Sequence, residues 1–240
     1  MVKFIENELL NIRKEVVDMW VLVYSQLKTV CEAVVDGDKE KAWDVLMREK
    51  RVNASELKLD CDVEDFLVLY NPVAIDLRFV LAMYKINADL ERIGDFAENI
   101  ARFIIKQDGR KPDADLLKQL RFEEMASRVL EMLDTSREAM VKEDLGLANK
   151  VFAMDNLVDE INANVTPVLA GYIKQHPDET EFALDFKSVF LRIERAGDHV
   201  TNLAEEIIFY IDAEVLKHSS KNAKDEALMH RVRENGSEEA

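Results

Sequence analysis

An internal repeat constrains the fold of this chain more than any other feature of its sequence. A shift of 106 residues aligns Val35-Asp36-Gly37-Asp38 with Val141-Lys142-Glu143-Asp144. A shift of 103 residues, which allows for a three-residue deletion, aligns Leu90-Glu91-Arg92-Ile93-Gly94-Asp95 with Ile193-Glu194-Arg195-Ala196-Gly197-Asp198. Matching signatures in the same order indicate a duplicated unit.

Each repeat contains three stretches in which apolar residues recur with the period of a helix. They cover about residues 4–35, 39–70 and 75–104 in the first repeat, and 113–141, 144–175 and 178–216 in the second. Each stretch has an apolar face that it must bury, so each triplet is predicted to form a three-helix bundle. Pro167 lies inside the fifth stretch and predicts a kink or break there, because proline removes one backbone hydrogen bond.

We therefore expect an all-α protein built from two tandem, sequence-related three-helix bundles with six long helices. The bundles cover residues 1–110 and 111–216, and a charged C-terminal extension of residues 217–240 is expected to be frayed or disordered. The chain has only 7 Gly and 4 Pro among 240 residues, which disfavours a sandwich or barrel with many short strands. Because neither G-x-G-x-x-G nor G-x-x-x-x-G-K occurs, a dinucleotide or P-loop fold is not expected.

The charge balance limits the possible partners. With 32 basic and 48 acidic residues, the formal net charge is −16, which repels nucleic acid and anionic lipid and attracts cations. The longest apolar run, Met19 to Tyr24, is far too short to span a membrane. Cys31 and Cys61 form no disulfide framework. We expect a soluble cytoplasmic protein that binds no nucleic acid and does not insert directly into a membrane.

The repeated motif places two acids on one helical face. On a helical wheel, Glu91 and Asp95 lie one turn apart on a face that points away from the core of the bundle, and Glu194 and Asp198 repeat the arrangement. Carboxylates spaced i, i+4 repel each other by a few tenths of a kcal/mol on an isolated helix. A solvated charged face is one interpretation, and a cation held between the carboxylates is the other.

The neighbouring helix of the second repeat carries a further acidic pair, Asp155 and Asp159. The corresponding residues of the first repeat are Glu49 and Asn53, so one acid is replaced by an amide that carries no net charge. A cation site in the second repeat is therefore the better supported of the two.

Glycine occurs beside the acids in both repeats, at Gly94 and Gly197. A glycine within a helix costs about 1 kcal/mol relative to alanine. Its presence indicates that a neighbouring helix or a bound ion approaches closely. Together with the acidic pairs, the two glycines favour a metal-binding face.

The candidate ligands are all oxygen donors, which favours Mg, Ca, Mn or Fe over a structural zinc site of thiolates and imidazoles. No histidine follows a glutamate at E-x-x-H spacing, so the di-iron motif of ferritin-like proteins is not present in the sequence. His199 adjoins Asp198, yet it points about 100° away on the helix, so a surface histidine is favoured over a ligand. Signatures of nucleophilic or zinc-hydrolase catalysis do not occur.

The segment Asn71-Pro72-Val73-Ala74-Ile75-Asp76-Leu77-Arg78 opens the third helical stretch and resembles Q-P-x-A-x-D-L-R, with asparagine in place of the first glutamine. With this segment and the paired L-E-R-I-G-D motifs, the chain resembles the PhoU family of phosphate-uptake regulators over about residues 4–212.

This resemblance implies a cytoplasmic regulator of phosphate homeostasis that is not an enzyme. Members restrain the ABC-type phosphate transporter, through its ATPase subunit, and a phosphate-sensing histidine kinase; dimers are common, so a homodimer is expected. The resemblance also implies a divalent or trivalent metal ion, of which Fe, Mg, Mn and Zn are the candidates. The implied ligands match the family's acidic motifs: Glu49, Glu91, Asp95, Asp155, Asp159, Glu194 and Asp198.

Two alternatives remain at this point. A carboxylate-bridged metalloenzyme would need an open metal position in a pocket. A general helical adaptor or co-chaperone would carry the acidic faces without using them.

Overall fold

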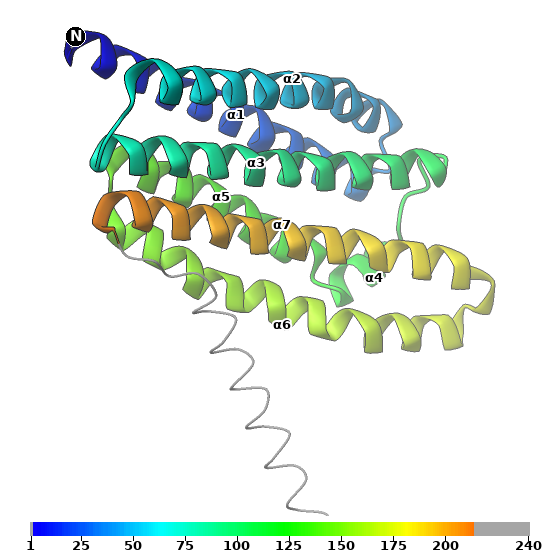
Figure 1. Cartoon of the computed structure of the whole chain (residues 1–240). Coiled ribbons are helices and arrows are strands. Elements are labelled where there is room, and N and C mark those ends of the chain that lie inside the picture. The colour runs from blue at the N-terminus through cyan, green and yellow to red at the C-terminus, as the bar shows by residue number, and fades with distance from the viewer. Residues whose placement is uncertain (1, 214–240) are drawn as a thin grey trace, which may run out of the picture.

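Seven α-helices and one short 3-10 helix make up residues 2–213, the part of the chain that the computed structural model describes, with side chains from residue 5 onward (Figure 1). The elements are α1 (Val2–Asp36), α2 (Lys39–Tyr70), α3 (Ile75–Lys106), α4 (Ala114–Gln119), α5 (Phe122–Lys142), α6 (Leu145–Gln175), η1 (Pro177–Glu179) and α7 (Thr180–Asp212). Residues 2–213 contain no strand. The prediction of an all-α fold with six long helices in two tandem bundles is confirmed, and α4 is a short addition. The expected extension at 217–240 lies outside the described residues.

The helix predicted over residues 113–141 is divided into α4 and α5. Arg121 adopts a left-handed backbone conformation with φ of 53°, which ends one helix and redirects the chain into the next. Its guanidinium binds Glu124 and, at 2.6 Å, Glu160 of α6. Leu120 just before it is buried. The hydrophobic period continues across this break, so it gave no sign of the turn.

Of the kink or break predicted at Pro167, the break does not occur: α6 is one continuous helix from Leu145 to Gln175. Proline removes one donor and leaves the carbonyl four residues earlier without its helical partner. Both Pro167 and Ala163 are exposed. The lost hydrogen bond therefore lies on the exposed side of α6, and the helix continues across the proline.

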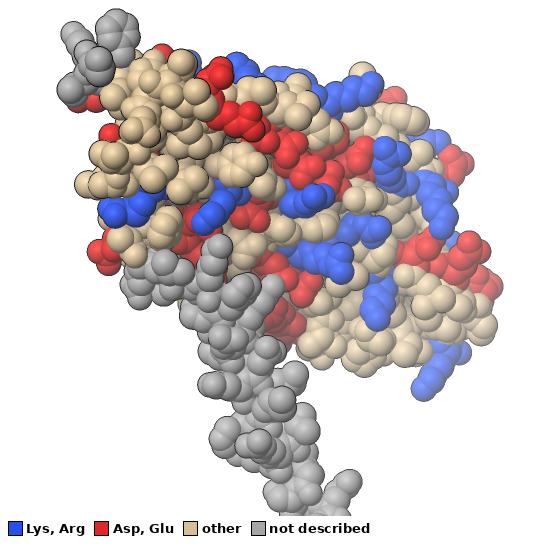
Figure 2. Space-filling view, in the orientation of Figure 1, with Lys and Arg blue, Asp and Glu red and all other residues tan. Residues whose placement is uncertain are grey.

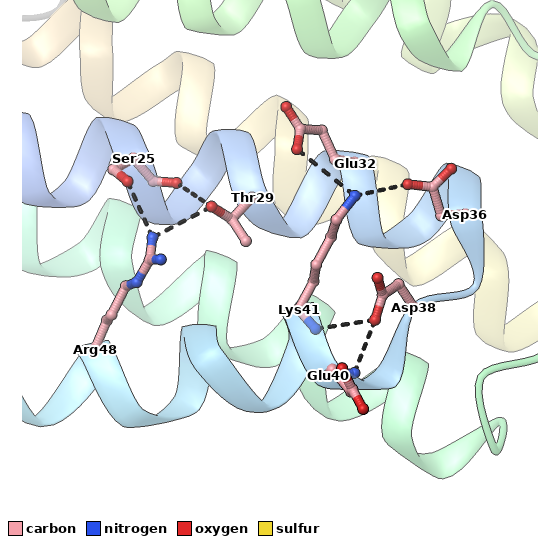
Figure 3. A network of polar contacts seen from close by, with 8 residues as sticks. All are labelled: Ser25, Thr29, Glu32, Asp36, Asp38, Glu40, Lys41 and Arg48. Carbon is pink, nitrogen blue, oxygen red and sulfur yellow. Dashed lines mark hydrogen bonds and ion pairs between the residues drawn. The ribbon is translucent and has the colours of Figure 1, made fainter.

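The second helix of each bundle begins at an aspartate. Asp38 accepts hydrogen bonds from the backbone N–H groups of Glu40 and Lys41 at 2.9 and 3.1 Å (Figure 3). Asp144, 106 residues later, makes the equivalent bonds to Gly146 and Leu147 at 2.8 and 3.1 Å. Such caps satisfy the first free donors of a helix. The duplication therefore includes the helix starts.

Side-chain contacts then hold α2 against α1. Lys41 lies between Glu32 and Asp36, and Arg48 donates to the hydroxyl groups of Ser25 and Thr29 (Figure 3). These contacts are partly exposed, so they orient the two helices more than they stabilise them.

The two bundles pack side by side and share one hydrophobic core. Figure 1 shows α3 and α7 next to each other at the centre, with α2 and α6 at opposite edges. Lys85 of α3 forms an ion pair at 2.8 Å with Glu206 of α7. The indole of Trp20 in α1 donates to the carbonyl of Leu133 in α5 at 3.0 Å. Within residues 2–213, no helix is both long enough and apolar enough to cross a membrane.

Candidate functional site

The first acidic cluster is centred on Glu49, which α2 presents to α3. Glu49 is only 3% exposed, an unusual burial for a glutamate. Gly94 lies opposite: a Cβ at this position would be 3.2 Å from Glu49 Oε2 and 3.2 Å from Val52 Cγ1. The mid-helix glycine therefore makes room for a carboxylate of the neighbouring helix, which is one of the two explanations that the sequence suggested.

One hydrogen bond holds the buried carboxylate. Gln26 Nε2 of α1 donates to Glu49 Oε2 at 2.6 Å and also lies 3.4 Å from the carbonyl of Val45. Within the described part of the chain, Glu49 Oε1 and Gln26 Oε1 are buried without a hydrogen-bond partner. An unpaired buried oxygen costs about 1–3 kcal/mol. The two acceptors belong to side chains that are hydrogen-bonded to each other, and a proton or a cation beside them would be stabilised.

The acids around Glu49 further favour a proton or a cation at this carboxylate. Burial, together with the negative charges of Asp95, Glu98 and Glu91, raises the pKa of Glu49 to about 7, although the hydrogen bond from Gln26 acts to lower it. An acid with this pKa carries a proton in part of the molecules at neutral pH.

Glu91 and Asp95 lie half-buried at the edge of this cluster. Burial and the neighbouring Asp95 raise the pKa of Glu91. Arg92 Nη1 donates to Asp95 Oδ2 at 2.9 Å, so this arginine, which belongs to the same motif, neutralises part of the motif's negative charge. A band of acidic side chains runs along the face between α2 and α3 (Figure 2).

Two members of the cluster were not predicted from the sequence. Gln26 lies on the apolar stripe of α1, between Val23 and Val30, and a single polar residue at such a position was the available signal. Glu56 lies two turns after Glu49, and burial, together with the charges of Asp60 and Asp95, raises its pKa. Nothing in the local sequence distinguishes Glu56 from an exposed glutamate.

The second cluster repeats the arrangement with Asp155 of α6 and Gly197 of α7. Asp155 is 3% exposed, and a Cβ at position 197 would lie 3.4 Å from its Oδ1. Burial, together with the negative charges of Asp198, Asp159 and Asp155, raises the pKa of Glu194 to about 7. The seven acids named from the sequence therefore fall into two groups, one in each bundle.

The two clusters carry different side chains at several corresponding positions. Under the 106-residue shift, Met132 corresponds to Gln26, and both are fully buried. Asp159 corresponds to Asn53. The first cluster therefore has the amide of Gln26 where the second has a methionine, and the second has the carboxylate of Asp159 where the first has the amide of Asn53.

The chemistry of these side chains suits a hard cation, because the donors are carboxylate and amide oxygens, and burial together with the neighbouring negative charges raises the pKa values of Glu49 and Glu194. Across residues 2–213, however, no three His, Cys, Asp or Glu side chains are gathered as the ligands of one metal ion would be. Coordination would require some of the half-buried side chains to change rotamer. Metal binding by these residues stays a prediction.

His199, considered above as a nitrogen ligand, has another partner. Its Nδ1 lies 2.7 Å from Asp89 Oδ1 of α3, and its ring packs against Phe96 with the ring centroids 5.5 Å apart. It therefore contributes to the contact between α3 and α7.

Comparison with known proteins agrees with this duplicated architecture. The family model described as "PhoU domain" matches residues 16–104 and 122–207. The chain is 29% identical to the phosphate-specific transport system accessory protein PhoU homolog 1 of Thermotoga maritima, covering 85% of the chain and 87% of that protein. It is 30% identical to the PhoU homolog of a Burkholderia species, with 93% and 95% covered.

Solved structures give the same result. The crystal structure of PhoU from Pseudomonas aeruginosa superposes with a TM-score of 0.81 at 28% identity, covering 87% of the chain and 99% of that structure. The phosphate transport system regulatory protein PhoU of Streptococcus pneumoniae, at 21% identity, has the same fold, with a TM-score of 0.77 over 88% and 98% of the two chains.

The two glycines are expected to respond differently to alanine. At position 197 the new Cβ meets its neighbours at ordinary contact distances of 3.4–3.7 Å, so Gly197→Ala should stabilise the chain by about 0.5–1 kcal/mol through helix propensity. At position 94 both Glu49 and the β-branched Val52 must move, so Gly94→Ala should destabilise it by about 1 kcal/mol. Urea unfolding followed by circular dichroism measures both values. Equal stabilisation by the two substitutions would contradict this account of Gly94.

The pH dependence of stability should reveal the buried Glu49. Its pKa rises from 4.5 to about 7 on folding, so between these values the unfolded chain has lost a proton that the folded chain keeps. Stability contributed by the protonated acid is therefore lost as the pH rises through this window. In the presence of a chelator, Glu49→Gln should be more stable than wild type by on the order of 2 kcal/mol at pH 8, and the gain should vanish near pH 4.5.

Thermal or urea unfolding at a series of pH values measures the difference in stability between Glu49→Gln and wild type. Glu194→Gln should show the same dependence on pH. A difference from wild type that stays constant across the pH range would show that Glu49 does not titrate near neutrality.

Proposed function

This chain belongs to the PhoU family, and from that membership we propose that it regulates phosphate uptake and phosphate-starvation signalling. The match of the family model to both repeats carries this proposal, because it accounts for the duplication and the paired motifs together. Relatives covering about nine-tenths of the chain are named accessory proteins of the phosphate-specific transport system. A regulatory accessory protein acts by binding, so we propose no turnover of its own.

The proposed partners are the ATPase subunit of the phosphate ABC transporter and a phosphate-sensing histidine kinase, both restrained when phosphate is plentiful. The proposed compartment is the cytoplasm, and the proposed working form is a homodimer. A net charge of −16 disfavours the binding of free phosphate by the chain itself. The phosphate signal is therefore expected to arrive through the conformations of the partners.

We also propose that the two acidic clusters hold cations. The buried, unpartnered Glu49 Oε1 and the raised pKa values of Glu49 and Glu194 support this, since both are features that a nearby positive charge would relieve. A bound cation supplies charge neutralisation. The chain itself supplies the carboxylates and the glycines that bring the paired helices together, α2 with α3 and α6 with α7.

Co-purification tests the regulatory role. Tagged full-length chain, expressed in its own cells under high and low phosphate, should capture the transporter ATPase subunit or the histidine kinase, and capture should be greater in high phosphate. Mass spectrometry identifies the captured proteins, and an unrelated acidic helical protein with the same tag is the control. If neither partner is captured in either condition, the proposed regulatory role is wrong.

A further inference from the structure

The outward face of α2 is unusually apolar for a surface helix. Five large apolar side chains of this helix are each more than half exposed: Trp43, Met47, Leu57, Val68 and Leu69. The helix lies at one edge of the molecule and packs on α1 and α3 with its opposite side (Figure 1). Within the described part of the chain, nothing covers this face.

The exposed face follows a seven-residue repeat. It consists of two sets of exposed residues, and within each set the residues are seven apart. One set is Met47, Ala54, Cys61 and Val68, and the other is Trp43, Lys50, Leu57 and Glu64. The two sets alternate along the helix at intervals of four and three residues. These are the spacings of the a and d positions of a coiled coil. Six of the eight residues are apolar or weakly polar, and the seam runs for about 37 Å at about 1.5 Å per residue.

The duplicated helix α6 is an internal control for this feature. The positions 106 residues later are mostly polar or small and all exposed: Asn149, Ala153, Asn156, Glu160, Ala163, Pro167, Ala170 and Lys174. None of the large exposed apolar side chains lies on α6. The fold therefore does not require an apolar stripe at this place, and the stripe is a property of α2 alone.

We propose that the outward face of α2 binds the same face of a second copy of the chain, with the two helices antiparallel about a two-fold axis near Ala54 and Leu57. This names the surface of the homodimer proposed above and rests on it. In this arrangement a and d positions form shared layers, as in an antiparallel coiled coil. The largest residue, Trp43, lies opposite Val68 of the second copy, and the smallest, Ala54, lies opposite Leu57.

The charged residues in the seam favour this orientation and a second copy as the occupant. Lys50 and Glu64 form no ion pair within the described chain. In the antiparallel arrangement, Lys50 comes within about one helical turn of Glu64 of the second copy, and the two-fold axis makes the contact twice. A parallel arrangement would bring Lys50 to Lys50 and Glu64 to Glu64, with repulsion at both ends.

Sedimentation of the full-length chain in reducing buffer tests the proposal. Wild type should form a dimer of the 27.6 kDa chain, and Leu57→Glu should raise the dissociation constant about tenfold or more by placing a charge in the seam. The matched control is Ala163→Glu, the corresponding position of α6, which should leave the dissociation constant unchanged. Circular dichroism confirms that both variants stay folded, as expected for exposed positions.

A charge exchange tests the register. Lys50→Glu and Glu64→Lys should each weaken the dimer, and the double variant should restore it, because the opposite charges then meet again. The fluorescence of Trp43, exposed in the isolated chain, should shift to shorter wavelength on dimerisation, while Trp20 is already buried.

Each contrary outcome is distinct. A monomeric wild type overturns the homodimer and this surface together. A dimer that Leu57→Glu leaves intact overturns the surface alone, and a double charge variant that stays weak overturns the antiparallel register. Capture of the transporter ATPase subunit or kinase by Leu57→Glu shows separately whether the regulatory role holds.

Discussion

The burial of a carboxylate between two helices is the constraint around which each bundle is arranged. Glu49 and Asp155 are each 3% exposed, and a charged group at such depth is unfavourable unless it is paired or protonated. Each lies opposite a glycine of the adjoining helix, which lets the two backbones approach around the acid. Both halves of the chain contain a mid-helix glycine and a cluster of like charges, and each of these features lowers the stability of the fold. The repetition of such destabilising features is expected where the negative charge of the cluster serves to bind a cation.

The helices that carry the clusters also join the bundles. One side of α3 bears Glu91 and Asp95, and elsewhere the same helix contacts α7 through the pairs Lys85–Glu206 and Asp89–His199. A change in the charge of a cluster therefore acts on helices that also form the contact between the two bundles. The hydrophobic core continues across that contact, so the described residues form one packed body.

The sequence predicted the long helices well because each has a regular apolar period and a polar or proline-containing end. The start and end of α2, at Lys39 and Tyr70, follow directly from Asp38 and Asn71-Pro72. The division at Arg121 could not be predicted, because a left-handed arginine leaves no trace in the period and depends on a partner, Glu160, from another helix. Of the kink or break predicted at Pro167, the break was wrong, because the exposure of this part of α6, which lets the helix continue without one hydrogen bond, is a tertiary property.

For the candidate site, spacing identified the acidic positions and the importance of the two glycines. It did not reveal that Glu49 and Asp155 are the buried members, nor that Gln26 from α1 completes the first cluster. A helical wheel of a single helix gives only the direction of a side chain. The depth of that side chain depends on how closely the next helix approaches.

Carbon-detected NMR titration of the glutamate carboxyl groups, without and with Mg²⁺, tests the central claim most directly. Two glutamates, Glu49 and Glu194, are expected to have a pKa of about 7 in the presence of a chelator, and both values should fall clearly when the cation is added. If all glutamates titrate near 4.5, or if the two raised values do not respond to Mg²⁺ or to the other candidate metals, the acidic clusters are not cation sites.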